Sequence, residues 1–275
     1  RKALRTSQID GTTVTGFLRT ISYAGGEDAA AISSDAEIYP AKTTGEISAT
    51  AYIVRDLTTD ITIAQHDQDR LVPIASLTKL VTAVVSRKLI LQGEKLALSQ
   101  TAIDTYGNSG GLRVGEQFTA GELLYPLLMV SSNDAAEALA LRYGRTRFLQ
   151  AMNDFAQSIG AYRTYFADAS GLSPRNASTA NDVALILDWI RVNDPSILSI
   201  TELKSQTIRA HTWVNPAHFL SFSYYVGGKN GYTDEADNTM ASLFTLGAHN
   251  DTYAVVVLGS KDRDADVTAL LKKIK

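Results

Sequence analysis

Three short segments of the chain carry side chains that could perform chemistry together. In the first, Ser76 and Lys79 stand three residues apart at the start of the apolar stretch "PIASLTKLVTAVV". A helix places residues at this spacing on neighbouring turns of one face, within hydrogen-bonding reach. Burial makes a charged lysine costly, so it lowers the lysine pKa and lets the amine accept the serine proton. The pair therefore predicts a nucleophilic serine with a lysine base. A capping serine followed by a surface lysine is the alternative.

The second and third segments lie farther along the chain. Ser131 and Asn133 stand between two apolar helical stretches, where either residue could also serve as a helix cap. Residues 229–231, Lys-Asn-Gly, directly precede a Tyr-Thr pair, and their Asn-Gly pair could also form a hairpin turn. Each segment alone is weak evidence for a site. The three together, in this order and each at a junction of elements, favour one active site.

Other chemistries find no support in the sequence. The letters G-x-S-x-G occur at 107–111, but no apolar strand precedes them and no helix follows, so a loop is predicted. The four histidines lack the spacing of metal ligands, and no nucleotide-binding glycine motif occurs, so we predict neither a metal nor a cofactor. The chain has no cysteine. Its net charge of −3, with both signs interspersed, does not indicate a nucleic-acid partner.

The rest of the sequence predicts the elements that position these segments. Strands are expected at 47–54 and 61–65 near the start, and at 239–246 and 252–260 near the end. A further strand is expected near 14–21. Because two strands alone are barely stable, the first and last strands must share one sheet.

Helices are predicted through the middle of the chain. Thr119 and Glu122 form a capping box before an apolar helix, and Thr179 can cap a later one. A closing helix is expected at 265–274. Glycines after periodic apolar stretches indicate three helix ends, at Gly93, Gly144 and Gly160. The order of elements predicts one α+β unit, with a mostly antiparallel sheet flanked by helices and a helical lobe at about 93–200.

These segments resemble those of a known protein family. The segments "ASLTKLVTAVV", "LLYPLLMVSSNDAAEALA" and "GGKNGYT" are similar to the three signatures of the low-molecular-mass penicillin-binding D,D-peptidases. These are the D-alanyl-D-alanine carboxypeptidases and their endopeptidase relatives. The likeness spans about residues 48–275 and includes "FADASGLSPRNASTANDVA". It implies the fold of the serine β-lactamases and penicillin-binding proteins, with an all-helical lobe and the cleft between sheet and lobe. Residues 46–275 are then the catalytic domain, and residues 1–45 an extension of unknown role.

The resemblance also implies a role for each motif residue. Ser76 would attack the carbonyl between two D-alanines, and Lys79 would take its proton. Ser131 would relay a proton to the leaving amine, Asn133 would hold Lys79 and the substrate amide, and Lys229 would supply positive charge. Backbone N–H groups of residues 76 and 232 would form the oxyanion hole. The implied substrate-binding residues are Asn230, Gly231, Tyr232, Thr233 and Arg263.

One residue departs from the family pattern. The third signature usually reads Lys-Thr-Gly or Lys-Ser-Gly, whereas here Asn230 replaces the hydroxyl residue. An amide can still donate a hydrogen bond, but it is bulkier than a hydroxyl and does not place the donor in the same position. The substitution therefore bears on recognition of a terminal carboxylate more than on activation of the serine.

The resemblance predicts a serine D,D-carboxypeptidase that removes the terminal D-alanine from peptidoglycan stem peptides, with β-lactams as covalent inhibitors. A D,D-endopeptidase that cuts peptide cross-links is the nearest alternative. A class A β-lactamase would need a glutamate loop of the form E-x-x-x-N after the second motif, and none occurs between residues 133 and 229. A non-catalytic wall-binding protein is the alternative from a different class.

The substrate also predicts where the protein acts. Peptidoglycan lies outside the cytoplasm, so we expect an extracytoplasmic protein. The chain starts with Arg1 rather than Met and contains no apolar run as long as a membrane span. We therefore expect a processed ectodomain, with any membrane association through a removed segment.

Overall fold

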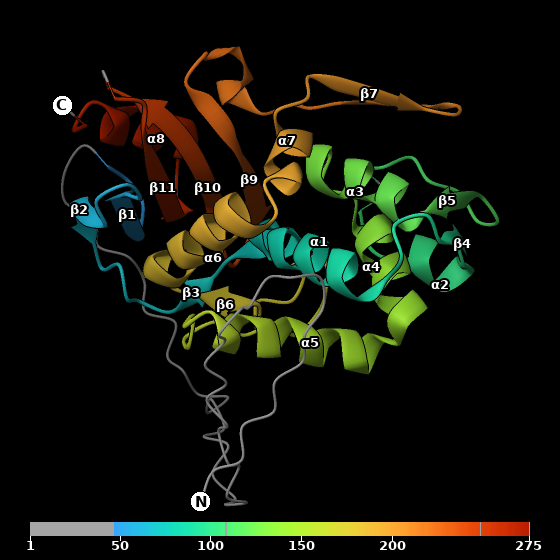
Figure 1. The fold of residues 1–275 in the computed structure, drawn as a ribbon. Helices are drawn as coiled ribbons and strands as arrows, with labels where there is room; N and C mark the ends of the chain where they lie inside the picture. The colour runs from blue at the N-terminus through green and yellow to red at the C-terminus, as the bar shows by residue number, and fades with distance from the viewer. Residues whose placement is uncertain (1–46, 108, 248, 275) are drawn as a thin grey trace, which may run out of the picture. The chain divides into compact units, whose positions relative to one another are not determined.

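The computed structural model describes residues 47–107, 109–247 and 249–274. The strand predicted near 14–21 and the extension at 1–45 lie outside these residues. A five-stranded antiparallel sheet forms the centre of the described part, in the order β2-β1-β11-β10-β9 (Figure 1). Its strands are β1 (Ala51–Asp56), β2 (Ile61–His66), β9 (Tyr225–Thr233), β10 (Asp237–Leu246) and β11 (Asp251–Ser260).

The two ends of the described chain meet inside this sheet. β1 pairs with β11, from Ala51 opposite Leu258 to Asp56 opposite Tyr253. β11 and β10 are buried on both faces along most of their length, β11 with an unbroken apolar stretch and β10 with the small polar residues Thr239 and Ser242 among its apolar ones. The prediction that first and last strands share an antiparallel sheet is confirmed.

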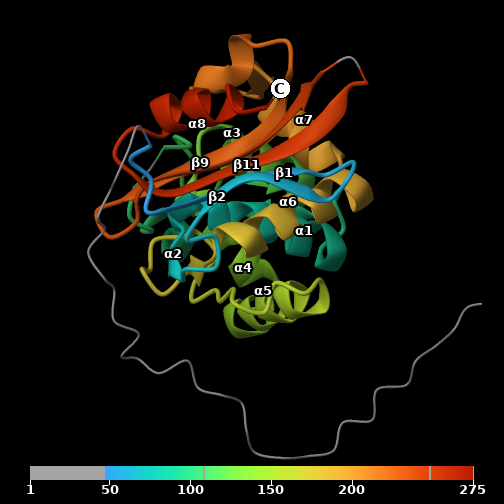
Figure 2. The ribbon, with the colours of Figure 1, turned by 90° about the vertical axis from the view of Figure 1, so that its left-hand side faces the viewer.

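Helices cover both faces of the sheet, and Figure 2 shows α8 on one side with α1 and α6 on the other. The helices are α1 (Thr78–Leu89), α2 (Gln100–Ile103), α3 (Ala120–Met129), α4 (Asn133–Tyr143), α5 (Arg145–Ser158), α6 (Ala180–Asn193), α7 (Ser196–Thr201) and α8 (Arg263–Leu271). Two 3₁₀ turns, η1 (Ala75–Leu77) and η2 (His218–Ser221), complete the helical elements of the described residues. The α+β architecture is confirmed, and α1 packs against α3, α4 and α5 in the helical lobe.

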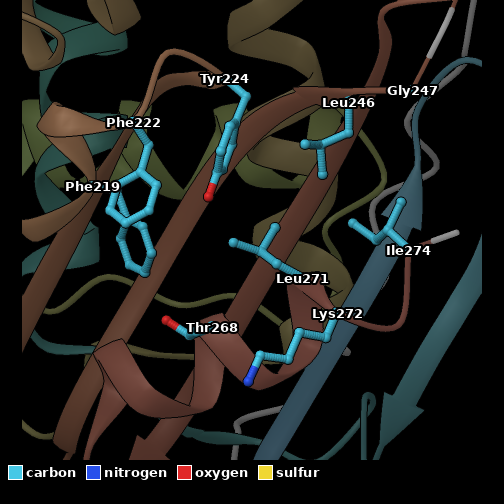
Figure 3. Close-up of a pocket in the computed structure, with 9 residues that line it drawn as sticks. All are labelled: Phe219, Phe222, Tyr224, Leu246, Gly247, Thr268, Leu271, Lys272 and Ile274. Carbon is cyan, nitrogen blue, oxygen red and sulfur yellow. The ribbon is translucent and has the colours of Figure 1, made fainter.

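Two hydrophobic clusters hold these layers together. The larger one joins α1, α3, α4, α5 and α6 to one face of the sheet through residues such as Leu80, Leu127 and Val256. The smaller one lies on the other face, where Val267 and Leu270 of α8 pack on the sheet. Next to it, a mainly apolar groove of about 390 Å³ is open at the surface (Figure 3). Its lining residues are Phe219, Phe222, Tyr224, Leu246, Gly247, Thr268, Leu271, Lys272 and Ile274.

Most of the predicted helix signals act as expected. The Thr119 hydroxyl accepts the N–H of Glu122 while the Glu122 carboxylate accepts the N–H of Thr119, which completes the capping box. The Thr179 hydroxyl accepts the N–H of Asp182 and caps α6. Gly144 and Gly160 follow α4 and α5 with left-handed backbones. These local signals fix where the lobe helices begin and end.

The prediction that the first helix ends at Gly93 is wrong. α1 ends at Leu89, and the buried Ile90 turns into extended backbone. The side-chain amide of Gln92 donates to the carbonyl of Ile90 at 2.9 Å. The helix therefore ends one turn before Gly93, where Ile90 is buried in an extended conformation and its carbonyl is paired with the Gln92 side chain.

Several short pairings were not predicted. They are β3 (Val72–Pro73) with β6 (Ala177–Ser178), β4 (Lys95–Ala97) with β5 (Gln117–Thr119), and β7 (Ser205–Ile208) with β8 (His211–Val214). The pair β4–β5 lies within the lobe region, β6 of the lobe pairs with β3 before it, and β7–β8 follows the lobe. Strand β9 was also missed, because its Gly-rich, Asn-Gly sequence is typical of a turn.

Candidate active site

Ser76 lies in η1, immediately before α1. Ala75, the residue before it, adopts φ = 47°, in the left-handed region that non-glycine residues rarely occupy. Such a conformation costs about 1–2 kcal/mol. Ser76 itself is half-buried, whereas its neighbours Ala75 and Leu77 are buried.

Lys79 lies one turn into the helix region and is completely buried. Its Nζ is 3.0 Å from Ser76 Oγ and 2.7 Å from the amide oxygen of Asn133. A third contact joins Nζ to the backbone carbonyl of Ser170. The alternative of a surface lysine is therefore wrong, and the predicted serine–lysine contact is present.

The environment of Lys79 favours its neutral form. Burial lowers the pKa of Lys79 well below that of an ordinary lysine, and the positive charge of Lys229 lowers it further. The carboxylate of Asp168 acts in the opposite direction and raises it. The pKa of the Lys79 amine that contacts Ser76 is thus set by burial and by two charges of opposite sign.

The second segment contributes Asn133 to the same cluster. The Ser132 hydroxyl accepts the N–H of Ala135 and caps α4, so neither Ser131 nor Asn133 serves as the cap. Asn133 instead accepts from Lys79 and donates through Nδ2 to the carbonyl of Tyr106 at 2.7 Å.

Ser131 has an unusual backbone and an unused hydroxyl. Its φ is 61°, so Ser131, like Ala75 beside the nucleophile, is a non-glycine residue in the left-handed region. Its Oγ is buried and has no hydrogen-bond partner within the described parts of the chain. Strained backbone and unpaired buried polar groups are both typical of functional sites.

The third segment forms the edge strand β9. Gly231 packs so closely on η1 that a Cβ there would lie 2.7 Å from the backbone nitrogen of Ser76. The interpretation of residues 229–231 as a hairpin turn is therefore wrong. Tyr232 is 59% exposed beside this contact. The Thr233 hydroxyl accepts the N–H of Ala236 and thus stabilises the turn after β9.

Lys229 and Arg263 bring positive charge to this strand. Lys229 is buried, and its Nζ donates to the carbonyl of Asn230 at 2.7 Å and lies 3.4 Å from the Asn230 amide oxygen. Arg263, at the start of α8, donates to the carbonyl of Gly231 and to Asn238, each at 3.1 Å. Burial and the nearby charge of Arg263 lower the pKa of Lys229 to about 7.

The sequence of the chain matches a known family of proteins. A family model described as D-alanyl-D-alanine carboxypeptidase matches residues 37–262. The chain belongs to this family. It is 35% identical over 242 residues to a D-alanyl-D-alanine endopeptidase of Pseudomonas aeruginosa, covering 82% of this chain and 76% of that one. It is 30% identical over 244 residues to the carboxypeptidase DacB2 of Mycobacterium tuberculosis, covering 81% and 80%.

A solved structure agrees with the sequence comparisons. The D-alanyl-D-alanine carboxypeptidase from Mycobacterium tuberculosis superposes with a TM-score of 0.77 at 27% identity, over 85% of this chain and 93% of that one. The predicted penicillin-binding-protein fold is confirmed. The chain spans 56–80% of the lengths of four curated relatives.

Two parts of this D-alanyl-D-alanine carboxypeptidase family site were not predicted from the sequence. The loop at 168–173 supplies the Ser170 carbonyl to Lys79, and its Gly171 lies against the backbone of Ala75 and Ser76. The second part is formed by Tyr106 and Gly107: the Tyr106 carbonyl accepts from Asn133, and Gly107 lies beside the same side-chain amide. The Asp-x-x-Gly-Leu sequence at 168–172 could have indicated the first part of the site. No sequence pattern indicates the second part.

The described residues contain no group of three His, Asp or Glu side chains that could hold a metal ion. None of their helices has the length and apolar character needed to cross a membrane. The apolar groove of Figure 3 belongs to the smaller cluster, on the sheet face opposite the cluster that contains Leu77 and α1.

Proposed function

We propose that this serine peptidase is a D,D-carboxypeptidase that removes the terminal D-alanine from peptidoglycan stem peptides. The observation that carries the proposal is the contact of the buried Lys79 with Ser76 Oγ. We further propose that it acts outside the cytoplasm, where its substrate lies, that β-lactams acylate it, and that residues 46–275 form its catalytic domain.

The hydrogen bonds of Lys79 support its role as the base. A neutral lysine amine has two N–H donors and one lone pair. The Asn133 amide oxygen and the Ser170 carbonyl can only accept hydrogen bonds, so they take both donors. The lone pair then faces Ser76 Oγ, whose proton it can accept.

The reaction follows from these positions. Ser76 Oγ bonds to the carbonyl carbon between the two D-alanines as its proton moves to Lys79. The peptide C–N bond then breaks as the proton held by Lys79 passes through the unpartnered hydroxyl of Ser131 to the leaving amine, which leaves Lys79 neutral again. Water hydrolyses the acyl-enzyme with Lys79 again as base. The edge position of β9 supports an oxyanion hole made by the N–H groups of residues 76 and 232.

Lys229 and Arg263 support recognition of a free terminal carboxylate. Both cations lie at β9, where Arg263 already contacts the Gly231 carbonyl. A bound carboxylate would favour the charged form of Lys229, whose pKa is lowered to about 7 in its absence.

A D,D-endopeptidase is the second candidate, and two observations favour it. Relatives from Pseudomonas aeruginosa and Escherichia coli, 35% and 32% identical, are named endopeptidases. Asn230 also replaces the hydroxyl residue that would bind a terminal carboxylate. A cross-linked peptide whose leaving amine carries no free carboxylate would not need the hydroxyl.

One experiment tests both candidates and the nucleophile. The protein is incubated with a defined pentapeptide and with a defined cross-linked dimer, and the products are identified by mass spectrometry. Release of D-alanine from the pentapeptide supports the carboxypeptidase, and cleavage of the dimer alone supports the endopeptidase. A fluorescent penicillin should label the peptide containing Ser76, and Ser76→Ala should remove the label while the fold remains intact. Labelling of another serine, or no labelling and no turnover, would overturn the proposal.

A further inference from the structure

We infer that Asp168 is a positioning residue for the base: it shapes the 168–173 loop, which holds the Ser170 carbonyl on Lys79 and Gly171 against Ser76. The inference rests on the proposed role of Lys79 as base. Asp168 lies in a stretch that resembles the family, but the resemblance assigns it no role, and no step of the reaction proposed for this chain uses it.

The Asp168 carboxylate organises the loop from within. One oxygen, Oδ1, accepts the backbone N–H groups of Ser170 at 2.9 Å and Gly171 at 2.6 Å, and also the Ser170 hydroxyl at 3.0 Å. The other, Oδ2, accepts the N–H of Ser173 at 2.7 Å. Burial alone would raise the pKa of Asp168, but the N–H donors of Ser173 and Gly171 outweigh it and hold the pKa below its ordinary value. The carboxylate is therefore charged under ordinary conditions.

The loop fixes both members of the serine–lysine pair. The Ser170 carbonyl accepts from Lys79, and the neighbouring carbonyl of Ala169 accepts from Thr82 of α1 at 2.6 Å. Gly171 has φ = 87°, and a Cβ there would lie 2.1 Å from the carbonyl oxygen of Ala75. The loop thus has no free space on its Ser76 side. A change in its shape would displace the Lys79 acceptor and the nucleophile together.

Asp168 also acts on Lys79 through its charge. Two charged groups influence Lys79: Lys229 from β9, which lowers its pKa, and Asp168 from the loop, which raises it. The remaining contacts of Lys79 Nζ are neutral, namely the Ser76 hydroxyl, the Asn133 amide and the Ser170 carbonyl. Arg263 acts indirectly, because it lowers the pKa of Lys229. On α4, burial raises the pKa of Asp134 to about 6.

The test is the pH dependence of acylation by a chromogenic penicillin, measured by stopped flow on the full chain. Asp168→Asn keeps an oxygen acceptor for the loop and removes the charge. Without that charge Lys79 loses its proton more easily, so the acid limb of the profile should move to lower pH. The plateau rate should fall about tenfold or more, because the base and nucleophile are less well positioned. Asp168→Glu keeps the charge and misplaces the loop, so it should lower the plateau and leave the acid limb in place.

Two further variants serve as controls. Asp56 accepts the N–H groups of Thr58 and Thr59 in the β1–β2 turn, so Asp56→Asn removes a similar carboxylate far along the sheet. Asp56→Asn should leave both the acid limb and the plateau rate of the pH profile unchanged. Asp134→Asn separates any titration of Asp134 from that of Lys79, and its acid limb should match that of the unmodified protein.

The outcomes separate this inference from the proposed function. If penicillin does not acylate Ser76 in the unmodified protein, the proposed function fails first. If it does, and Asp168→Asn lowers the rate equally at every pH without moving the acid limb, Asp168 is only a structural loop residue and the inference is overturned. If Asp168→Asn does not fold, Asp168→Glu is the deciding variant. A folded Asp168→Glu protein whose plateau acylation rate is unchanged would overturn the positioning role of Asp168.

Discussion

At the scale of single residues, the two buried lysines make opposite demands on pH. Lys79 must be neutral to accept the serine proton, whereas Lys229 must be charged to bind a carboxylate. Burial lowers the pKa of both, and that of Lys229 falls to about 7. Acylation gains as pH rises through the Lys79 pKa, and carboxylate recognition is lost as pH rises through the Lys229 pKa. The substrate-free enzyme should therefore show a bell-shaped profile of kcat/KM on peptides with a free terminal carboxylate.

This profile is checked with a D-Ala-D-Ala peptide between pH 5 and 10. The two apparent values belong to the interacting pair rather than to either lysine alone. Arg263→Gln removes the charge that lowers the Lys229 pKa, so it should move the alkaline limb to higher pH. It should also raise KM, because one cation at the carboxylate site is gone. A rate that keeps climbing to pH 10 would show that neither lysine is tuned as described.

Asn230 is the residue where the chain leaves its family pattern, and its effect can be measured directly. A charge-assisted hydrogen bond contributes roughly 1.5–3 kcal/mol. Restoring a hydroxyl donor with Asn230→Thr should therefore raise kcat/KM on a D-Ala-D-Ala peptide by about ten- to a hundredfold. The change also removes the amide oxygen that lies 3.4 Å from Lys229 Nζ, which frees this ammonium for the substrate.

The matched substrate for this prediction is a cross-linked dimer without a free carboxylate at the scissile bond. Its cleavage by Asn230→Thr should change much less. A loss of activity on every substrate would mean that Asn230 is an adapted contact and that the substrate is not an ordinary D-Ala-D-Ala terminus.

At the scale of elements, local signals predicted helices better than strands or loops. Thr119 with Glu122, Thr179 and Gly144 act within a few residues, so their sequence alone reveals the helix ends. β9 forms by pairing with β10, and its Gly231 packs against η1, a contact between residues far apart in sequence. No local pattern could show it.

The same distinction explains which site residues were predicted. Ser76, Lys79 and Asn133 carry recognisable motifs, and the structure brings them together. Ser170 contributes only a backbone carbonyl, which any residue type could supply. Its place in the site therefore depends on loop geometry rather than on side-chain identity.

Gly171 offers a prediction at this scale. It shares φ = 87° with Gly160, but a Cβ at Gly171 would meet the Ala75 carbonyl at 2.1 Å, whereas a Cβ at Gly160 would meet nothing within 4 Å. Gly160→Ala should cost only the backbone term of about 1–2 kcal/mol. Gly171→Ala should cost more and should also abolish most acylation, because the loop must move away from Ser76.

Urea unfolding and penicillin labelling of both glycine variants check this prediction. Equal losses of stability with normal labelling in both would mean that the loop can shift freely. The tight contact between the 168–173 loop and the nucleophile would then not be needed for acylation.

At the scale of the whole molecule, the fold followed from the order of elements, because strands at both ends of the sequence leave little choice but to pair. The sequence did not reveal which contact stabilises the end of the β1–β11 pairing. Ser48, just before β1, donates through its N–H and its hydroxyl to the two oxygens of the buried Asp266 in α8, at 2.7 and 2.8 Å. The Ser260 hydroxyl donates to the same carboxylate.

This contact allows the catalytic domain to be delimited by experiment. The predicted site residues and both hydrophobic clusters lie within residues 47–274. A chain that begins at residue 46 should therefore fold and react with penicillin at the rate of the full chain. A chain that begins at residue 51 lacks Ser48 and leaves Asp266 with fewer donors. An unsatisfied buried acceptor costs about 1–3 kcal/mol, and more when it is charged, so this shorter chain should unfold at clearly lower urea concentration.

Ser48→Ala in the full chain is the matched control, because it removes the hydroxyl bond and keeps the backbone N–H bond to Asp266. Its loss of stability should lie between those of the two shortened chains. Its acylation rate should be normal, because Asp266 lies in α8 on the sheet face opposite α1. If the chain beginning at residue 46 fails to fold or to react with penicillin, the boundary is wrong, and residues before 46 are part of the catalytic domain.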